Sequence, residues 1–212
     1  VQVFSTDFAF AALRADGSVV TWGWSSSGGD SSAVAAQLDG TNDVVQVFST
    51  DRAFAALRAD GSVVTWGDSG YGGNSSTVAP QIDGTIDVTQ VFSADYAFAA
   101  LRADGSVVTW GAASYGGDSS AVSGDLDGTS DVVQVASTDR AFAALRADGS
   151  VVFWGDSSYG GGMPVEAQWI RAPAVHVFSS ARAFAVLRAD GSVVTWGDSS
   201  YGGNSSVVAA QL

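Results

Sequence analysis

Hydrophobic residues alternate with polar or small residues in short runs along the whole chain, with a period close to two. Residues 53–58 and 62–66 form two such runs, and their β-branched and aromatic side chains suit a pleated sheet. A run at 45–48 precedes them, and a weaker run at 77–82 follows. The pattern predicts four short strands in this stretch, and its period excludes a helical solenoid.

The connection between the second and third predicted strands is the dipeptide Asp60-Gly61. A two-residue Asp-Gly loop needs positive φ at both positions, which Asp and Gly tolerate. We therefore expect a tight hairpin with positive φ at both residues. Residues 68–76 are polar and Gly-rich and predict a loop, and a second Asp-Gly at Asp83-Gly84 leads into the next first strand.

The same pattern recurs along the chain, and a Trp-Gly pair marks its phase. The marker residues are Trp22, Trp66, Trp110, Trp154 and Trp196, at steps of 44, 44, 44 and 42 residues. Four antiparallel strands in a repeat of this length are typical of one β-propeller blade, whereas a parallel β-helix has shorter coils without tight hairpins. We predict an all-β protein with a single propeller domain of five four-stranded blades, at 1–44, 45–88, 89–132, 133–174 and 175–212.

The chain begins and ends at the same phase of the repeat. A ring broken at one linker would do so, and we therefore expect the five blades to close into a ring. The alternative is an incomplete arc of a larger propeller.

The repeat resembles that of the regulator of chromosome condensation 1 (RCC1) family. The pattern ALxxDGxVxxWGxxxxGG runs from Ala56 through Trp66 to Gly73, and its copies cover nearly the whole chain. The compact period is most similar to the bacterial β-lactamase-inhibitory members, whose VPAEAQ segment resembles residues 163–168. Arrays in some microalgae also have similar repeats, DGSVVTWG followed by YGGDSS.

This resemblance implies a propeller that serves as a protein-binding platform, without an enzymatic activity. The family members that act as nucleotide-exchange factors use an inserted β-wedge, and no insertion interrupts these repeats. Family repeats usually carry His before the apolar strand and Gln-Leu-Gly after Trp-Gly, where this chain has Asp-Arg-Ala at 51–53 and Tyr-Gly-Gly at 71–73. Familiar members have seven blades, so five repeats is a departure.

The chain is strongly acidic, with a net charge of −13 and nine positive charges that are all arginine. Such a field repels nucleic-acid phosphates and anionic membrane surfaces, so we expect no nucleic-acid partner. We also expect no direct membrane insertion, because no run reaches 18 apolar residues. The sequence starts at Val1, so an upstream targeting segment for an organelle lumen or secretion stays open.

Chemistry-bearing residues are scarce. There is no Cys and one His, and His176 aligns with Gln46 and its equivalents, so we expect no nucleophilic triad, no enzyme and no cofactor. The aspartates recur at hairpin turns, which explains them without a catalytic role. The Gly-Gly-Asp-Ser at 28–31 resembles calcium-binding nonapeptides but occurs only once per blade, and Gly72-Gly73 lacks the Lys and helix of a phosphate loop. We predict no metal site and no small-molecule ligand.

Positions that vary between near-identical repeats are not dictated by the blade, so they are candidates for function. The first turn and the loop after the third strand should emerge on one face, and both Asp-Gly turns on the other. The variable turn position holds Phe8, Arg52, Tyr96, Arg140 and Arg182; the loop holds Tyr71, Tyr115, Tyr159 and Tyr201, with Trp24 as a single case in the first repeat. Interface cores favour aromatic and Arg side chains. The structural alternative for the tyrosines is a lid over neighbouring blades.

A second candidate surface lies in residues 162–175, which are two residues shorter than their counterparts. This segment contributes Met163, Trp169, Ile170 and Arg171 to the predicted binding residues. An exposed Trp-Ile beside Arg is costly in water unless something covers it.

These observations predict a non-catalytic protein-binding or scaffolding propeller, with an extrinsic subunit of a larger algal or organellar membrane complex as a variant. The alternative is a lectin with one shallow sugar site per blade. A lectin should show equivalent sites in every blade, whereas the loop Tyr is missing from the first repeat and Asp68 becomes Ala112 in the third.

Overall fold

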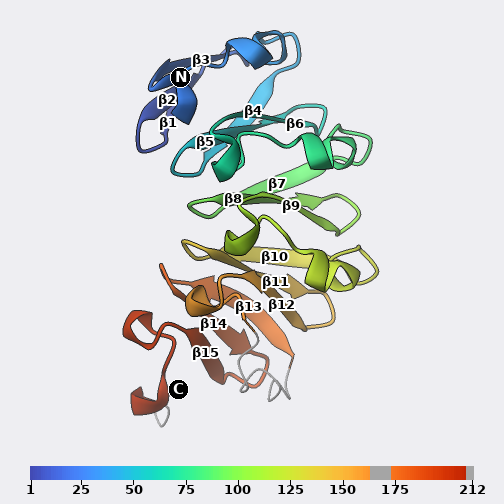
Figure 1. Ribbon diagram of the computed structural model, residues 1–212. Helices are drawn as coiled ribbons and strands as arrows, with labels where there is room; N and C mark the ends of the chain where they lie inside the picture. The colour runs from blue at the N-terminus through green and yellow to red at the C-terminus, as the bar shows by residue number, and fades with distance from the viewer. Residues whose placement is uncertain (163–172, 209–212) are drawn as a thin grey trace.

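The computed structural model describes residues 1–162 and 173–208. Each repeat folds into a three-stranded antiparallel sheet in sequence order, and the five sheets lie in a stack (Figure 1). The strands are β1 (Gln2–Ser5), β2 (Ala9–Leu13) and β3 (Val19–Gly23); β4 (Val44–Ser49), β5 (Ala53–Arg58) and β6 (Val63–Gly67); β7 (Val88–Ser93), β8 (Ala97–Arg102) and β9 (Val107–Gly111); β10 (Val132–Ser137), β11 (Ala141–Arg146) and β12 (Val151–Gly155); β13 (Ala174–Ser179), β14 (Ala183–Arg188) and β15 (Val193–Gly197).

Short 3₁₀ helices follow the third strand of each repeat. They are η1 (Ser25–Ser27) and η2 (Ser32–Gln37); η3 (Ser69–Tyr71) and η4 (Ser76–Gln81); η5 (Ala113–Tyr115) and η6 (Ser120–Asp125); η7 (Ser157–Tyr159); η9 (Ser199–Tyr201) and η10 (Ser206–Val208). The first 3₁₀ turn of each of the five loops ends at a glycine with positive φ, as at Gly72, where φ is 92°. A glycine there relieves the clash that a side chain would suffer in the left-handed region.

The predicted fourth strand is wrong, because residues 76–81 form helix η4 and its counterparts η2 and η6 are also helical. Two apolar residues four positions apart, Val78 and Ile82, reach the core together, which is the spacing of a helical turn. Pro80 lacks the N–H that a strand ladder needs. Beyond the third strand, the described residues keep one isolated bridge, between Ser62 and Asp83, and backbone bonds such as Val63 N–H to the Ile82 carbonyl at 2.9 Å.

The Asp-Gly hairpin exists, but its predicted geometry is wrong. Arg58 N–H donates to the Ser62 carbonyl at 2.9 Å, and Gly61 N–H donates to the Arg58 carbonyl at 3.0 Å, so the loop has three residues. Gly61 has φ of 74°, and among the described residues only glycines have positive φ. Asp60 instead accepts hydrogen bonds from the Ser62 amide at 3.0 Å and the Ser62 hydroxyl at 2.6 Å. The Asp therefore stabilises the turn through its side chain.

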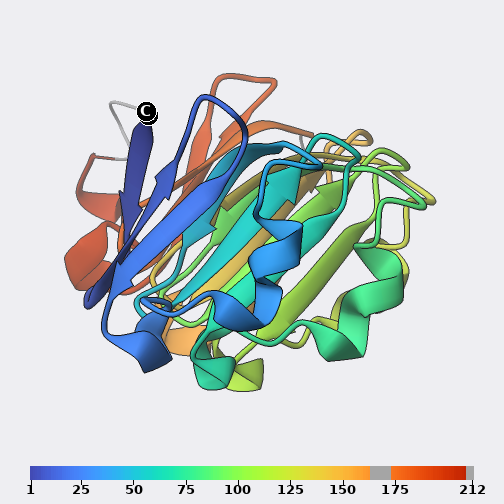
Figure 2. The ribbon, with the colours of Figure 1, turned by 90° about the horizontal axis from the view of Figure 1, so that it is seen from above.

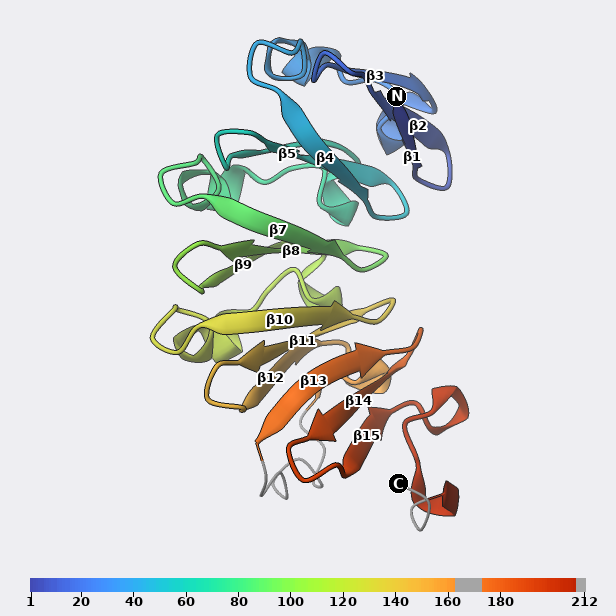
Figure 3. The same ribbon diagram turned by 180° about the vertical axis from the view of Figure 1, so that it is seen from behind.

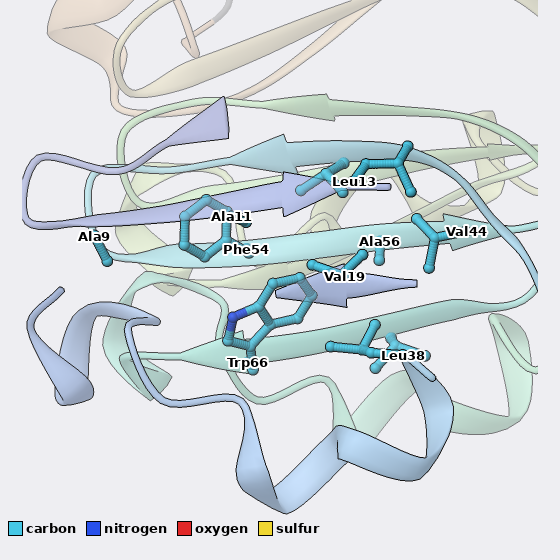
Figure 4. Packing of buried hydrophobic residues seen from close by; sticks show 11 residues of the cluster. Ala9, Ala11, Leu13, Val19, Leu38, Val44, Phe54, Ala56 and Trp66 are labelled. Carbon is cyan, nitrogen blue, oxygen red and sulfur yellow. The ribbon is translucent and has the colours of Figure 1, made fainter. Parts of the chain in front are cut away.

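Neighbouring sheets pack face to face, and the same kind of junction occurs four times between the five sheets. In the first junction Phe54 and Trp66 of the second repeat stack with ring centroids 5.2 Å apart and are 0% and 4% exposed. The partners from the two repeats are Ala9, Ala11, Leu13, Val19, Leu38, Val44 and Ala56 (Figure 4). Apolar burial of this extent is the main stabilising contribution to such a stack.

The expected closed ring is not what the structure shows. Sheet β1–β3 and sheet β13–β15 lie at opposite ends of the stack in Figures 1 and 3. Trp22 is 46% exposed, although its equivalents Trp66 and Trp196 are each 4% exposed. Seen from above, the strands of successive sheets are rotated relative to one another (Figure 2). The molecule is an open arc, in line with the alternative of an incomplete larger propeller.

Candidate functional site

Two connections of each repeat meet on one face of the arc, as the strand directions predict. In the second repeat these are the turn at residues 50–52 and the loop at 68–73. Asp68 N–H donates to the Arg52 carbonyl at 2.9 Å, and the Thr50 hydroxyl donates to the Tyr71 carbonyl at 2.9 Å. Equivalent hydroxyl bonds join Thr6 to Ser27, Thr138 to Tyr159 and Ser180 to Tyr201. The backbones that carry the variable residues are thus fixed to each other.

The variable residues form one continuous stack of rings and guanidinium groups, which we call the aromatic–arginine row. It crosses every repeat. The contacts are Arg52 over Phe8 (5.1 Å) and Tyr71 (5.0 Å); Tyr71 against Tyr96 (4.7 Å); Tyr96 against Tyr115 (4.7 Å); Arg140 over Tyr96 (5.4 Å), Tyr115 (5.0 Å) and Tyr159 (4.9 Å); and Arg182 over Tyr159 (4.9 Å) and Tyr201 (4.6 Å). All nine predicted turn and loop residues with these side chains are brought together.

The row is partly open to solvent. Its end members Phe8 and Tyr201 are 48% and 43% exposed, Tyr159 is buried, and the others lie between these limits. Rings that contact two neighbouring repeats also help to pack these repeats together. The predicted lid over neighbouring blades and the predicted binding surface therefore consist of the same side chains. A guanidinium stacked on an aromatic face contributes about 0.5–1 kcal/mol at exposed sites.

The arginines of the row differ from those of the opposite face. On the Asp-Gly face, Arg58 lies 3.0 Å from Asp60, and Arg146 lies 3.3 Å from Asp125. In the row, Arg182 approaches Asp198 only at 4.0 Å. No ion pair of Arg52 or Arg140 with a carboxylate is found within residues 1–162 and 173–208. The row therefore presents positive groups whose in-plane N–H donors are less neutralised than those of the opposite face.

Beside the aromatic–arginine row lies a line of aspartates, which we call the aspartate row and which the sequence analysis did not identify. Asp7, Asp51, Asp95 and Asp139 immediately precede the row's turn residues, and Ala181 has this position in the last repeat. They line a polar pocket of about 580 Å³ at the ends of the first strands, which Figure 3 shows side by side. Each amide donates to the next repeat's carbonyl, for example Asp51 N–H to Asp95 at 3.0 Å. The recurrent Ser-Thr-Asp before the variable residue was the signal in the sequence.

The proximity of these carboxylates changes their acidity. Burial, followed by the charges of Asp51 and Asp139, raises the pKa of the Asp95 carboxyl to about 6. Burial and then the charge of Asp7 also raise the pKa of Asp51. Both shifts have the sign expected when like charges share a partly desolvated site. Within the described part of the chain, no three His, Cys, Asp or Glu side chains are placed to hold one metal ion.

The remaining predicted residues do not join the row. Trp24 is 66% exposed at the position where Asp68 accepts a hydrogen bond from Gly70 N–H in the second repeat. Met163, Trp169, Ile170 and Arg171 lie outside the described residues. His176 is exposed on β13, where its ring lies 6.0 Å from that of Phe178. No helix of the described residues is long and apolar enough to cross a membrane.

Comparison with solved structures assigns the fold. The chain is similar to the ectodomain of the Physcomitrella patens receptor kinase CR4, at 18% identity and a TM-score of 0.57, covering 93% of this chain and 51% of that one. It is similar to human WBSCR16 at 19% identity and a TM-score of 0.56, covering 93% and 61%. It is also similar to yeast RCC1 (Prp20), solved bound to Kap60, at 18% identity and a TM-score of 0.54, covering 93% and 55%.

No protein-family model and no curated protein sequence matches the chain. The structural matches show the fold of an RCC1-like repeat β-propeller, which is the fold that the repeat pattern predicted. The chain spans about half to three-fifths of the length of these structures.

Proposed function

We propose that the protein is a non-catalytic protein-binding scaffold that recognises its partner through the aromatic–arginine row. The observation that carries this proposal is the continuity of the row from Phe8 to Tyr201, together with the variation of its turn position from repeat to repeat. A requirement of the fold alone would have produced the same residue in each repeat, as it does for the Phe-Trp pairs of the junctions. The variation from Phe8 to Arg52 to Tyr96 instead makes each part of the row different.

The chemistry of the row indicates what it would accept. The rings lie over the faces of the Arg52 and Arg140 guanidinium groups, and the Arg140 Nε is buried without a hydrogen-bond partner among the described residues, so the other guanidinium N–H groups are the donors offered to a partner. Guanidinium edges match carboxylates and backbone carbonyl oxygens, and the Tyr rings offer area for aliphatic or proline side chains. The adjacent aspartate row would repel a uniformly acidic partner. A partner segment with alternating acceptor and apolar groups fits best.

The fold relatives are consistent with this role, since yeast RCC1 with the same fold was solved bound to the protein Kap60. The lectin alternative has less support. A sugar site repeated in each blade would need the same side chains in each repeat, and the row presents Phe, Arg, Tyr, Arg and Arg at one equivalent position. A role as an extrinsic subunit of a larger algal or organellar membrane complex would be a more specific form of this proposal.

The proposal is tested by affinity capture from the native source, followed by quantitative mass spectrometry. The bait is the wild-type chain, and the matched bait is the variant Arg52→Ala/Arg140→Ala. A second control bait, Asp39→Asn/Asp127→Asn, changes charges on the opposite face. We expect partners that are retained by the wild type and by the second control and lost from the arginine variant. Partners that bind all three baits equally would contradict the assignment of the face.

A further inference from the structure

Three tyrosines stack directly on one another in the middle of the aromatic–arginine row, and we call them the tyrosine triad. Tyr71 lies against Tyr96 with ring centroids 4.7 Å apart and planes inclined by 30°, and Tyr96 lies against Tyr115 at 4.7 Å and 42°. These are the two closest ring pairs among residues 1–162 and 173–208. Tyr96 is therefore in contact with two other phenol rings.

The other two tyrosines of the chain are separated from the triad and from each other. The chain contains five tyrosines. Arg140 lies between Tyr115 and Tyr159, and Arg182 lies between Tyr159 and Tyr201. In the part of the chain that the structure describes, neither Tyr159 nor Tyr201 has a ring contact with another tyrosine. The chain thus offers its own comparison, with three phenols in contact and two isolated by guanidinium groups.

Backbone hydrogen bonds hold the triad together. Asp51 N–H donates to the Asp95 carbonyl at 3.0 Å, which joins the first turns of the second and third repeats. Ala112 N–H donates to the Tyr96 carbonyl at 3.0 Å, which joins this turn to the loop of Tyr115. Groups that a folded chain keeps in contact react as if their local concentration were very high. All three rings are also half-buried rather than enclosed, so a small solute can reach them.

We propose that the triad is a site of oxidative cross-linking, in which Tyr96 forms a dityrosine bond with Tyr71 or Tyr115 when the protein meets a one-electron oxidant. Each of the two phenols gives one electron to the oxidant and one proton to a base, which leaves a tyrosyl radical. The two radicals join through a ring carbon ortho to each phenolic oxygen. The hydrogens on these two carbons then move to the oxygens, so both phenols are restored. In total, two electrons and two protons leave, and one carbon–carbon bond forms.

Bases for the released protons lie beside Tyr96. Burial and then the charge of Tyr71 raise the pKa of the Tyr96 phenol, so the phenol is protonated at neutral pH and must release its proton on oxidation. The charges of Asp51 and Asp95 add to this rise, while Arg140 lowers the pKa, so both carboxylates lie close enough to act on the phenol. Above a pH of about 6 the Asp95 carboxyl is ionised and can accept the proton and pass it to water.

The cross-link would act as a covalent tie within the row. A bond between Tyr71 and Tyr96 joins the second repeat to the third, and a bond between Tyr96 and Tyr115 joins the turn and the loop of the third repeat. The rings are already in contact, so small ring rotations are enough to form either bond. The chain contains no Cys, whose thiolate would otherwise react with the oxidant. The inference does not depend on the proposed partner, and its test needs only the chain itself.

Photogenerated ruthenium(III) tris(bipyridine) serves as the oxidant, with persulfate as the final acceptor of the two electrons, and the chain is kept dilute so that copies rarely meet. Dityrosine fluorescence of the monomeric band on a denaturing gel measures the yield, and mass spectrometry of cross-linked peptides identifies the joined residues. We expect the wild type to form dityrosine within single chains. Tyr96→Phe keeps the stack but removes the central phenol, and should lower the yield by about tenfold or more.

A second variant and a matched control complete the test. The double variant Tyr71→Phe/Tyr115→Phe leaves Tyr96 without a neighbouring phenol and should show the same loss as Tyr96→Phe. Tyr201→Phe removes a phenol outside the triad and should retain the wild-type yield. Circular dichroism verifies that each variant is folded. A wild type that forms no dityrosine in the monomeric band would overturn the inference. Wild-type yield in Tyr96→Phe, an equal loss in Tyr201→Phe, or bonds that mainly join Tyr159 or Tyr201 would do the same.

Discussion

The indole nitrogen of Trp66 donates a hydrogen bond to the carbonyl oxygen of Gly28 at 3.0 Å, across the boundary between the second and first repeats. The same loop glycine has no side chain because the ring of Phe54 occupies that space. One Trp, one Phe and one Gly thus define the spacing of neighbouring sheets. This relationship recurs at every internal junction and gives the first prediction.

We expect Trp66→Ala to lower the free energy of unfolding by about 3–5 kcal/mol, because it leaves a large cavity between two sheets. Trp66→Phe keeps most of the ring but removes the donor and should cost about 1–3 kcal/mol, since the Gly28 carbonyl loses its partner. Urea denaturation followed by circular dichroism measures both. Trp22→Ala is the control and should cost much less, because Trp22 is 46% exposed. Equal losses for Trp22 and Trp66 would contradict the junction.

The contact between the junction glycine and the neighbouring Phe ring can be tested separately from the backbone strain that a side chain causes at positive φ. Gly72 and Gly202 have similar φ values of 92° and 98°, so Ala at either position pays about 1–2 kcal/mol for the left-handed region. Only at Gly72 would the new Cβ also meet a ring, 2.6 Å from Phe98. Thermal or urea unfolding should therefore show a larger loss for Gly72→Ala than for Gly202→Ala. The same loss at both sites would mean that the Phe98 contact contributes nothing.

The aromatic–arginine row should contain the binding hot spots. Once a partner is identified, Arg52→Ala and Arg140→Ala should each weaken binding by about 1–4 kcal/mol, because they remove guanidinium donors held between rings. Substituting Asp39, Asp83 or Asp127 by Asn should act mainly on the association rate and its salt dependence. Surface plasmon resonance separates the two effects. If the aspartate variants abolish binding while the arginine variants bind normally, the functional face is the other one.

The aspartate row should make stability depend on pH with an unusual sign. The pKa of Asp95 is raised to about 6 in the folded chain, whereas an unfolded Asp titrates near 3.9. Between those values the folded state binds the extra proton, so stability falls as pH rises from about 4 to about 6. Asp95→Asn removes this loss and should gain about 1 kcal/mol above pH 6, after allowance for solvent screening, and nothing below pH 4.

Asp190 is the matched control for this experiment. Hydrogen bonds from Ser192 lower the pKa of its carboxyl, so the folded state favours the ionised form. That contribution is present above the unfolded pKa and is lost as pH falls below about 4. Asp190→Asn should therefore lose stability at neutral pH, where Asp95→Asn gains it. Thermal unfolding at pH 4, 6 and 7.5 compares them, and shifts of the same sign in both variants would contradict the raised pKa that burial and the neighbouring carboxylates give Asp95.

The sequence could predict the features that depend on neighbours along the chain. Alternation gave strands β5 and β6 almost residue for residue, and the Trp-Gly spacing gave the repeats. It could not predict helix η4, because Val78 and Ile82 fit a strand of period two as well as a turn of four residues. The deciding factor was which side chains could reach the core that η4 shares with β9 of the following repeat. The predicted two-residue loop was also wrong. The number of loop residues depends on the pairing of Arg58 with Ser62, and the Asp-Gly dipeptide alone does not determine that pairing.

By itself the sequence determined the repeat, the fold and the face on which Phe8, Arg52 and Tyr71 would lie, because strand direction fixes the end of a sheet at which each connection emerges. Only the tertiary structure decided that these side chains form one continuous row, since their contacts join residues about 20 to 45 positions apart. It also decided that the arc stays open. The ends share a phase in sequence, but closure depends on the rotation between successive sheets, which is set by how Trp66 and its equivalents pack and which no local pattern encodes.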